Sequence, residues 1–233
     1  ARKGIQDWTD GQSLLELGLK SSALHAIAQL KAEHPELTQN KERAPIPLSV
    51  KTRLGYDSNI IDEWSDCLIQ GRPEVIAIHG RTLAQMYRGQ SDWEAIALAA
   101  QRIRKHGIGV LGNGDIQTLQ EATTRIQESG VNGVLIGRGS LGNPWIFQGI
   151  SQVRNALSIG SPLELMASEP SLDQKFQAMI EHAQYFEAIH GHERFVRMRK
   201  HLGWYCSSFP HAAAMRAQMV RTNGSQDVID ILH

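Results

Sequence analysis

The sequence lacks the features that would point to a membrane, a disulfide scaffold or a strongly charged partner. Its 233 residues carry 24 basic and 24 acidic side chains, so no net charge draws the whole chain to nucleic acid or to a membrane surface. No apolar run reaches the roughly 18–20 residues that span a bilayer, and no signal peptide is visible. Two cysteines, Cys67 and Cys206, are too few for a disulfide framework and favour a reducing, cytoplasmic setting. A polyanion would have to be met by a local basic patch.

Short apolar segments alternate with amphipathic ones through the first two thirds of the chain. Buried strands are predicted in IPLSVKTRL (46–54), EVIAIH (74–79), GVLG (109–112) and GVLI (133–136). Between them, apolar residues recur at helical spacing, in three groups: Leu24, Ile27 and Leu30; Ile60, Trp64, Cys67 and Leu68; Trp93, Ile96, Ala100 and Ile103. Repeated strand–helix units predict an α/β fold with a parallel sheet. Four units fit half of an eight-unit barrel or a flavodoxin-like open sheet equally well.

The pattern changes after the fourth predicted strand. The segment SIGSPLELMASEPS (158–171) is rich in Gly, Pro and Ser, and the chain beyond it reads as helical at roughly 172–190, 193–207 and 211–223. This predicts an α/β domain over residues 1–157, a linker over 158–171 and a helical domain over 172–233. Both cysteines are interpreted as packing residues, because Cys67 shares an apolar helix face and Cys206 follows two aromatic residues.

All four predicted strands end in polar or glycine residues, and parallel strands present these ends to a ligand. The ends read VKTRLGYD, IHGRT, GNGD and GRG. Lys51 would stabilise negative charge on a bound ring, or would only be a solvated lysine beside Arg53. His79 closes an apolar strand on the same rim, which favours a ligand contact over a core position. Arg81 and Arg88, around TLAQMYRG, would hold a substrate phosphate or only their own loop.

Two consecutive strands end in glycine-rich loops, GVLGNGDI (109–116) and GVLIGRGSLGNPWIF (133–147). Glycines let the backbone approach a ligand closely, and exposed N–H groups beside a helix N-terminus attract an anion. Barrels commonly bind phosphate at the loops after their last two strands. Arg138 would add a charge-assisted contact. The pair of loops predicts a phosphate cradle; the alternative is that these glycines only make tight turns.

In their order and spacing, VKTRLGYD, IHGRTLAQMYRGQSDW, GNGDI and GVLIGRGSLGNPWIF resemble the strand-end motifs of the tRNA-dihydrouridine synthases. The tail, with RMRKHLGWY and FPHAAAMR, resembles that family's helical domain. The resemblance runs from about residue 11 to the C-terminus. It implies a (β/α)8 TIM barrel, of which the last four β/α units are present here, followed by a C-terminal helical domain. The implied reaction is FMN-dependent reduction of the C5–C6 bond of specific uridines in tRNA, with NADPH as reductant.

The resemblance also implies roles for individual residues. It implies flavin-ring contacts at Lys51 and His79. The implied phosphate and ribitol contacts are Asn113, Gly114, Asp115, Gly137 and Arg138. Substrate contacts are expected at Arg53, Arg81, Arg88, Arg197, Arg199 and Lys200, the last three in a basic cluster of the tail that would meet RNA phosphates or form a solvated helix face. No metal site is expected.

The sequence departs from the family's pattern in one motif. The family's catalytic acid is a cysteine in an Asn-x-Gly-Cys-Pro type motif, which is absent here. The opening segment ARKGIQDWTDGQSLLE resembles the glycine-rich loop that follows this cysteine. We therefore expect the proton donor upstream of Ala1, with roughly 100 residues of barrel missing, exposed strand edges, and no activity of this chain alone. The alternatives are a non-catalytic half-barrel that binds tRNA or a protein, and another FMN-dependent pyrimidine oxidoreductase.

Overall fold

The core of the fold is a four-stranded parallel sheet. The computed structural model describes residues 1–35, 43–161, 163–164 and 169–233. The strands are β1 (Ser49–Arg53), β2 (Val75–His79), β3 (Gly109–Asn113) and β4 (Gly133–Leu135), and they lie side by side in chain order. All three neighbouring pairs are parallel. Each strand falls within two residues of its predicted segment except β1, which begins three residues later.

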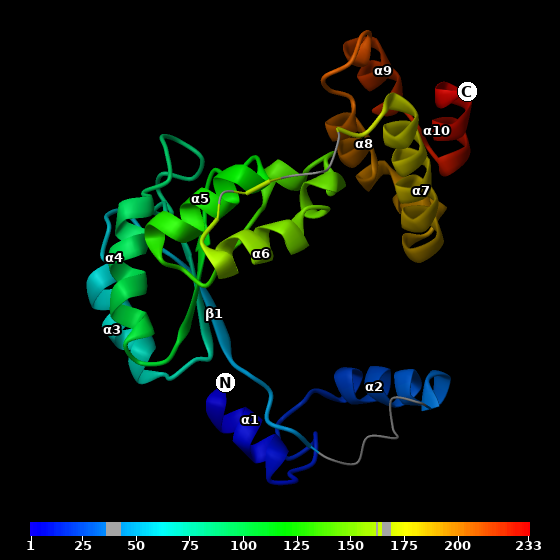
Figure 1. Cartoon of the computed structure of the whole chain (residues 1–233). Coiled ribbons are helices and arrows are strands. Elements are labelled where there is room, and N and C mark those ends of the chain that lie inside the picture. Colours follow the sequence, from blue (N-terminus) through cyan, green and yellow to red (C-terminus); the bar gives the residue numbers. More distant parts are fainter. Residues whose placement is uncertain (36–42, 162, 165–168) are drawn as a thin grey trace.

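Each strand after the first is reached through a helix. The crossover helices are α3 (Ile61–Gln70), α4 (Trp93–Arg104) and α5 (Leu119–Ser129), and α6 (Ile150–Ile159) follows β4. The helices lie along one face of the sheet, as Figure 1 shows for α3 and α4. A flavodoxin-like sheet has helices on both faces and a strand order that reverses. The sequential order and the one-sided helices are instead those of consecutive units of a (β/α)8 barrel.

The helix-covered face of the sheet carries the hydrophobic core. Ile76, Ile78 and Val110 alternate along β2 and β3 and are fully buried, as are Ile96 and Ile103 of α4. The predicted apolar face of α4 is therefore confirmed. The predicted face of α3 is only partly right. Leu68 packs against the core as predicted, but Ile61 and Ser65 are buried, whereas Trp64 and Cys67 are exposed. Trp64 lies beside the free edge of β1, where its indole N–H donates to Thr52 Oγ1 at 2.9 Å.

The N-terminal segment differs from the predicted loop. Residues Arg2–Thr9 form α1, and Ser21–Glu33 form α2. Arg43 fixes the end of α1, because its guanidinium lies 4.1 Å from the centre of the Trp8 ring and donates to the carbonyl of Trp8 at 3.0 Å. Neither helix contains a buried residue, so the apolar side of α2 predicted from Leu24, Ile27 and Leu30 packs against no core in the described part of the chain.

The C-terminal part is helical, as predicted. It comprises α7 (Leu172–His190), the 3₁₀ segment η4 (His192–Arg197), α8 (Arg199–Tyr205), α9 (Ala212–Met219) and α10 (Ser225–Leu232), which cluster beyond α6 in Figure 1. The predicted helix over 193–207 is interrupted near Met198, which is fully buried together with Phe195 and Leu202. The last helix, α10, was not predicted. Its Val228 is fully buried against the same core.

The predicted linker overlaps the end of α6. The helix runs to Ile159 and ends at Gly160, which adopts the left-handed conformation with φ 66°. Residues 162 and 165–168 of the linker lie outside the described residues, and the domain boundaries stay a prediction. The two parts touch elsewhere: a Cβ on Gly142, in the loop after β4, would lie 2.5 Å from the carbonyl carbon of Trp204 in α8.

Among the described residues, no helix is both long and apolar enough to cross a bilayer. The same residues contain no group of three or more His, Cys, Asp or Glu side chains arranged to hold a metal ion. Cys206 is buried, as predicted for a packing residue, and its thiol donates to the carbonyl of Leu202 at 3.4 Å.

Candidate functional site

The sheet register brings the predicted strand-end residues into one row. Arg53 pairs with His79, and His79 pairs with Asn113 across the three neighbouring strands. Side chains two positions apart on a strand share a face, so Lys51 lies on the same side as this row. Its Nζ is 3.4 Å from Asn113 Oδ1, and Asn113 Nδ2 donates to the carbonyl of Leu135 at 2.8 Å. The face opposite the helices is therefore polar at the carboxyl ends of the strands.

His79 is held in its neutral form by this environment. Partial burial lowers its pKa from 6.5 to about 4, and the positive charges of Arg53 and Lys51 act in the same direction. The pKa of Lys51 is also lowered, by burial and by Arg53. At neutral pH the rim thus presents an uncharged imidazole beside two cationic side chains. An uncharged imidazole has one N–H donor and one acceptor for a ring ligand.

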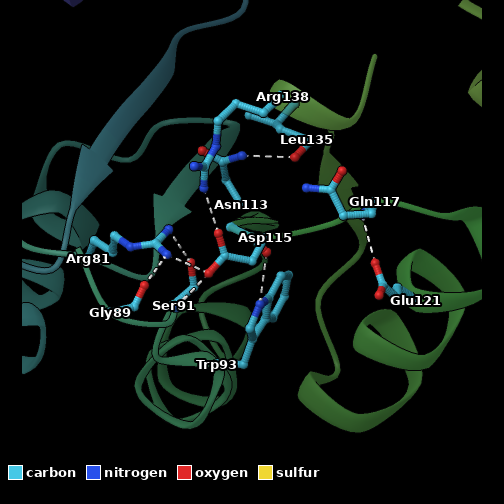
Figure 2. Close-up of polar contacts among 11 residues, drawn as sticks. Arg81, Gly89, Ser91, Trp93, Asn113, Asp115, Gln117, Glu121, Leu135 and Arg138 are labelled. Carbon is cyan, nitrogen blue, oxygen red and sulfur yellow. Dashed lines mark hydrogen bonds and ion pairs between the residues drawn. The ribbon is translucent and has the colours of Figure 1, made fainter. Parts of the chain in front are cut away.

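The GNGD turn after β3 is fixed by its contacts with the loop after β2. Gly114 and Asp115 have φ values of 146° and 51°, and a left-handed φ is rare for a residue other than glycine. Trp93 Nε1 donates to the carbonyl of Gly114 at 3.1 Å. A Cβ on Gly114 would overlap Ser91 Oγ and lie 2.5 Å from Ser91 Cβ. Glycine is required here because the two loops are in direct contact (Figure 2).

The carboxylate of Asp115 bridges two arginines. Its Oδ2 accepts from Arg81 Nη2 at 2.5 Å and from the amide of Ser91 at 2.9 Å, and its Oδ1 accepts from Arg138 Nη2 at 2.7 Å (Figure 2). Partial burial opposes ionisation of this carboxyl group. The hydrogen bonds from Arg81 and Ser91 outweigh that effect and hold its pKa at about 2. Asp115 is therefore ionised throughout the physiological pH range.

The structure corrects the expected role of Arg81. This side chain is only 2 % exposed, and its guanidinium donates to Ser91 Oγ at 2.8 Å and to the carbonyl of Gly89 at 2.6 Å, besides Asp115. Its Nε is buried without a partner. An arginine whose terminal nitrogens are used within the protein has no free face for a substrate. The buried partners override the rim position that the sequence predicts.

Arg138 differs from Arg81 in being open to solvent. Its side chain is 48 % exposed, and its guanidinium carbon lies 5.0 Å from the centre of the Tyr87 ring. A pocket of about 160 Å³ lies between the loops after β2, β3 and β4. It is lined by His79, Tyr87, Asn113, Gly114, Asp115, Ile116, Gln117, Leu135, Gly137 and Arg138. Five of these ten residues are the predicted phosphate and ribitol contacts, and His79 is a predicted flavin-ring contact.

A larger and more open hollow of about 610 Å³ lies beside the free edge of β1. Its lining combines Lys51 and Arg53 with exposed apolar side chains, among them Tyr56, Ile60 and Trp64. Arg53 also donates to the carbonyl of Thr82 at 3.0 Å, so one of its nitrogens is used to hold the loop after β2. Lys51 lines this hollow and also reaches Asn113 at the small pocket.

Some of the predicted basic side chains are exposed, and others are hydrogen-bonded within the protein. Arg88 is exposed and donates to the carbonyl of Ala84 at 3.1 Å, within its own loop. In the tail, Arg197 and Lys200 are exposed, and Lys200 Nζ is 6.0 Å from the centre of the Trp204 ring. Arg199 is occupied: it donates to the carbonyl of Thr222 at 2.7 Å and to Asn223 Oδ1 at 2.8 Å. Arg199 thus connects α8 to the loop before α10, which corrects its expected role as a substrate contact.

The sequence reasoning missed Tyr87, Ser91 and Trp93. Each lies in the block IHGRTLAQMYRGQSDW, in which Trp93 is predicted only as part of an apolar helix face and the other two residues are given no role. Their positions gave some signal, because an aromatic residue and a serine lie in the loop after one strand and the glycine turn lies after the next strand. Neutral residues that hold a loop are hard to recognise without coordinates because the same types occur in any turn.

The residues around the small pocket could hold the phosphate group of a ligand. One exposed guanidinium reaches the pocket, and no heavy atom lies within 4 Å of a Cβ placed on Gly137, so the backbone there is open to a ligand. The pocket volume of about 160 Å³ is below the roughly 300–1,000 Å³ of a complete ligand site. Only part of a nucleotide would lie inside it, with the remainder along the face that carries Lys51 and His79.

Comparisons with known proteins agree with these motifs. The family model "Dihydrouridine synthase (Dus)" matches residues 28–232. "Probable tRNA-dihydrouridine synthase 1" of Synechocystis is 34 % identical over 189 residues, which are 80 % of this chain and 50 % of the relative. "Probable tRNA-dihydrouridine synthase" of Rickettsia conorii is 34 % identical over 202 residues, covering 85 % of this chain and 57 % of the relative.

A third relative carries a more specific name. "tRNA-dihydrouridine synthase B" of Pseudomonas aeruginosa is 34 % identical over 179 residues, or 76 % of this chain and 51 % of the relative. The chain thus spans about half the length of the curated relatives it matches. Because the family match extends over both the β/α units and the C-terminal helices, the chain belongs to the dihydrouridine synthase family.

Proposed function

We propose that this chain carries the flavin-binding and tRNA-binding part of a tRNA-dihydrouridine synthase. The reaction is reduction of the C5–C6 bond of uridines in tRNA, with FMN as cofactor and NADPH as reductant. One observation carries the proposal: four motif-bearing strand ends converge on one rim, with a pocket that Arg138 reaches between the loops after β2, β3 and β4. The relatives named above, each called a tRNA-dihydrouridine synthase, support the same reaction.

Different residues of the rim would hold different parts of the cofactor. Arg138, with the open backbone at Gly137, would hold the phosphate, because a guanidinium and an open amide both bind phosphate oxygens. Lys51 would lie near the flavin ring and stabilise negative charge there, while neutral His79 would supply a hydrogen bond without adding charge. Bound and reduced, FMN supplies a hydride for the C5–C6 bond of a pyrimidine.

The helical part would contact the RNA backbone. Arg197 and Lys200 are exposed on neighbouring positions around the start of α8, and exposed cations bind phosphates without reading base sequence. The exposed Trp204 ring next to Lys200 offers a stacking surface for an unpaired base. The loop after β4 contacts α8 at Trp204, so this surface and the flavin rim belong to adjoining parts of the chain.

A titration of the purified chain with FMN tests the cofactor assignment. We expect saturable binding, seen as quenching of flavin fluorescence, and a loss of about tenfold or more in affinity in Arg138→Ala, because a charge-assisted phosphate contact contributes about 1.5–3 kcal/mol. Arg154→Ala is the matched control, since Arg154 is an exposed arginine of α6 away from the pocket. Equal affinity of the two variants, or no flavin binding by the folded chain, would refute the assignment.

The same preparation then tests substrate and reductant. We expect NADPH to bleach the bound flavin and tRNA to bind, with little or no dihydrouridine detected in the recovered tRNA by mass spectrometry, because the cysteine that the family uses as proton donor is absent from this sequence. tRNA binding without flavin binding would instead support the non-catalytic alternative for this chain. Reoxidation by free uridine or another free pyrimidine, but not by tRNA, would indicate a different pyrimidine oxidoreductase.

A further inference from the structure

The small pocket contains a carboxylate where an anion is proposed to bind. Asp115 lies among the residues that line it, and its pKa of about 2 leaves it negatively charged at every working pH. A bare carboxylate next to a phosphate is repulsive. A carboxylate at this position is therefore expected to have a role other than direct contact with the phosphate.

The geometry supplies that role. Each oxygen of Asp115 is directed at a different arginine: Oδ2 lies 2.5 Å from Nη2 of the buried Arg81, and Oδ1 lies 2.7 Å from Nη2 of the exposed Arg138 (Figure 2). Two guanidinium groups and one carboxylate leave a net charge of one positive unit. The carboxylate is thus neutralised from the buried side, and the remaining positive charge is on the residue that reaches the pocket.

We infer that Asp115 and Arg81 are positioning residues that orient Arg138 for the phosphate of the ligand and do not contact that phosphate themselves. The inference rests on the proposed function, which places a flavin phosphate in this pocket. Arg81 fixes Asp115 because its other contacts, Ser91 Oγ and the carbonyl of Gly89, hold it in the loop after β2. The chain of contacts therefore runs from that loop through the turn after β3 to the loop after β4.

The orientation of Arg138 has a second support on its other side. Its guanidinium lies 5.0 Å from the centre of the Tyr87 ring, so it is held between an aromatic face and a carboxylate. A long exposed side chain fixed in this way loses less rotational freedom when a ligand binds. Without Asp115, the side chain keeps its charge but loses the contact that sets its direction.

The test compares FMN with riboflavin, which lacks the phosphate. The ratio of their dissociation constants reports on the phosphate subsite alone. We expect the unmodified chain to prefer FMN, and Asp115→Asn to lose about 3–10-fold of that preference with riboflavin affinity unchanged, the range given by ordering one long side chain. Arg81→Lys keeps the buried charge but not the forked geometry, and should lose a similar share. Asp66→Asn, which removes a carboxylate from the surface pair with Arg102, is the control.

The double variant Asp115→Asn/Arg138→Ala shows whether the two residues act together. If Asp115 acts through Arg138, the double variant prefers FMN no less than Arg138→Ala alone. If the two residues made independent contacts, their losses of FMN preference would add. A gain of FMN affinity in Asp115→Asn would mean that the carboxylate simply repels the phosphate, and would overturn the inference. So would an unchanged ratio in both Asp115→Asn and Arg81→Lys.

Failure of the proposed function gives a different result. If the unmodified chain, folded by circular dichroism, binds FMN no better than riboflavin, the phosphate subsite itself is refuted, and the positioning role is refuted with it. If the unmodified chain prefers FMN and Arg138→Ala abolishes the preference while both positioning variants keep it, only the positioning role is refuted. A fall in riboflavin affinity that matches the fall for FMN would assign these residues to general stability of the rim and overturn the inference.

Discussion

Substitution of Gly114 by alanine should destabilise the chain more than the same change at any open glycine. Two effects add at this position. The backbone has φ 146°, where side chains other than glycine cost about 1–3 kcal/mol. The new Cβ would also overlap Ser91 Oγ and lie 2.5 Å from Ser91 Cβ, and overpacking of this kind costs about 1–3 kcal/mol. We expect a loss of about 3–5 kcal/mol in the free energy of unfolding.

Gly107→Ala separates the two effects. Gly107 also has a positive φ, 74°, but no heavy atom lies within 4 Å of a Cβ placed there. It should cost only the strain of a left-handed alanine, about 1–2 kcal/mol. Urea denaturation followed by far-UV circular dichroism measures both changes, provided that the denaturant slope is the same in each variant.

A second substitution tests whether contact with Ser91 is the cause. Ser91→Gly removes the two atoms that the alanine Cβ would overlap, at the cost of the hydrogen bond that Arg81 donates to Ser91. The double variant Ser91→Gly/Gly114→Ala should be more stable than the sum of the single changes by about 1–3 kcal/mol. The reasoning fails if Gly114→Ala costs no more than Gly107→Ala, or if the two changes at positions 91 and 114 are additive.

Three further predictions concern acid stability, the tail and the contact between the two parts. Folding lowers the pKa of His79 from 6.5 to about 4, so the folded chain binds fewer protons than the unfolded chain in that window, and stability falls as the pH drops from 6.5 through 4. His79→Asn should reduce this fall, measured as urea midpoints at each pH, and His25→Asn, at an exposed histidine, should not. Arg197→Ala should leave the melting temperature unchanged but weaken tRNA binding and reduce the salt slope of that binding by about one. Arg199→Ala should instead cost about 1–3 kcal/mol of stability through its lost hydrogen bonds. The reverse pattern in melting and filter-binding assays would contradict the assignment of Arg197 to RNA binding and of Arg199 to structure. Gly142→Ala should expose the contact with α8 to limited proteolysis, and an unchanged cleavage pattern would show that the loop can move aside.

The sequence predicted the sheet because its strands are short, apolar and regularly spaced. Burial on the helix-covered face imposes that pattern, and Ile76 and Ile78 read as clearly in the sequence as in the structure. The N-terminal helix α1 was not predictable in the same way. It buries no residue, and its contacts with distant residues, such as that of Trp8 with Arg43, leave no periodic signal in the segment itself.

The candidate site was predicted as a set of residues but not as an arrangement. Strand order placed Lys51, His79 and Asn113 on one rim, because parallel strands end together. Whether an arginine points outward or is buried depends on partners from other loops. The two arginines Arg81 and Arg138 follow strand ends in the same way, yet one is 2 % and the other 48 % exposed. Both contact Asp115, but only Arg81 also binds Ser91 Oγ and the carbonyl of Gly89, and no local pattern predicts these contacts.

The alternation of faces along the strands has a consequence for how this chain tolerates mutation. On β2, Ile76 and Ile78 face the helices, while Ala77 and His79 face the open side. Saturating substitution along β2 and β3, scored separately for abundance and for flavin capture, should therefore give two interleaved profiles with a period of two residues. One profile would record solubility and yield, and the other would record ligand selectivity. A library confined to the residues on the open side would leave the helix-covered core unchanged while sampling new cofactor preferences.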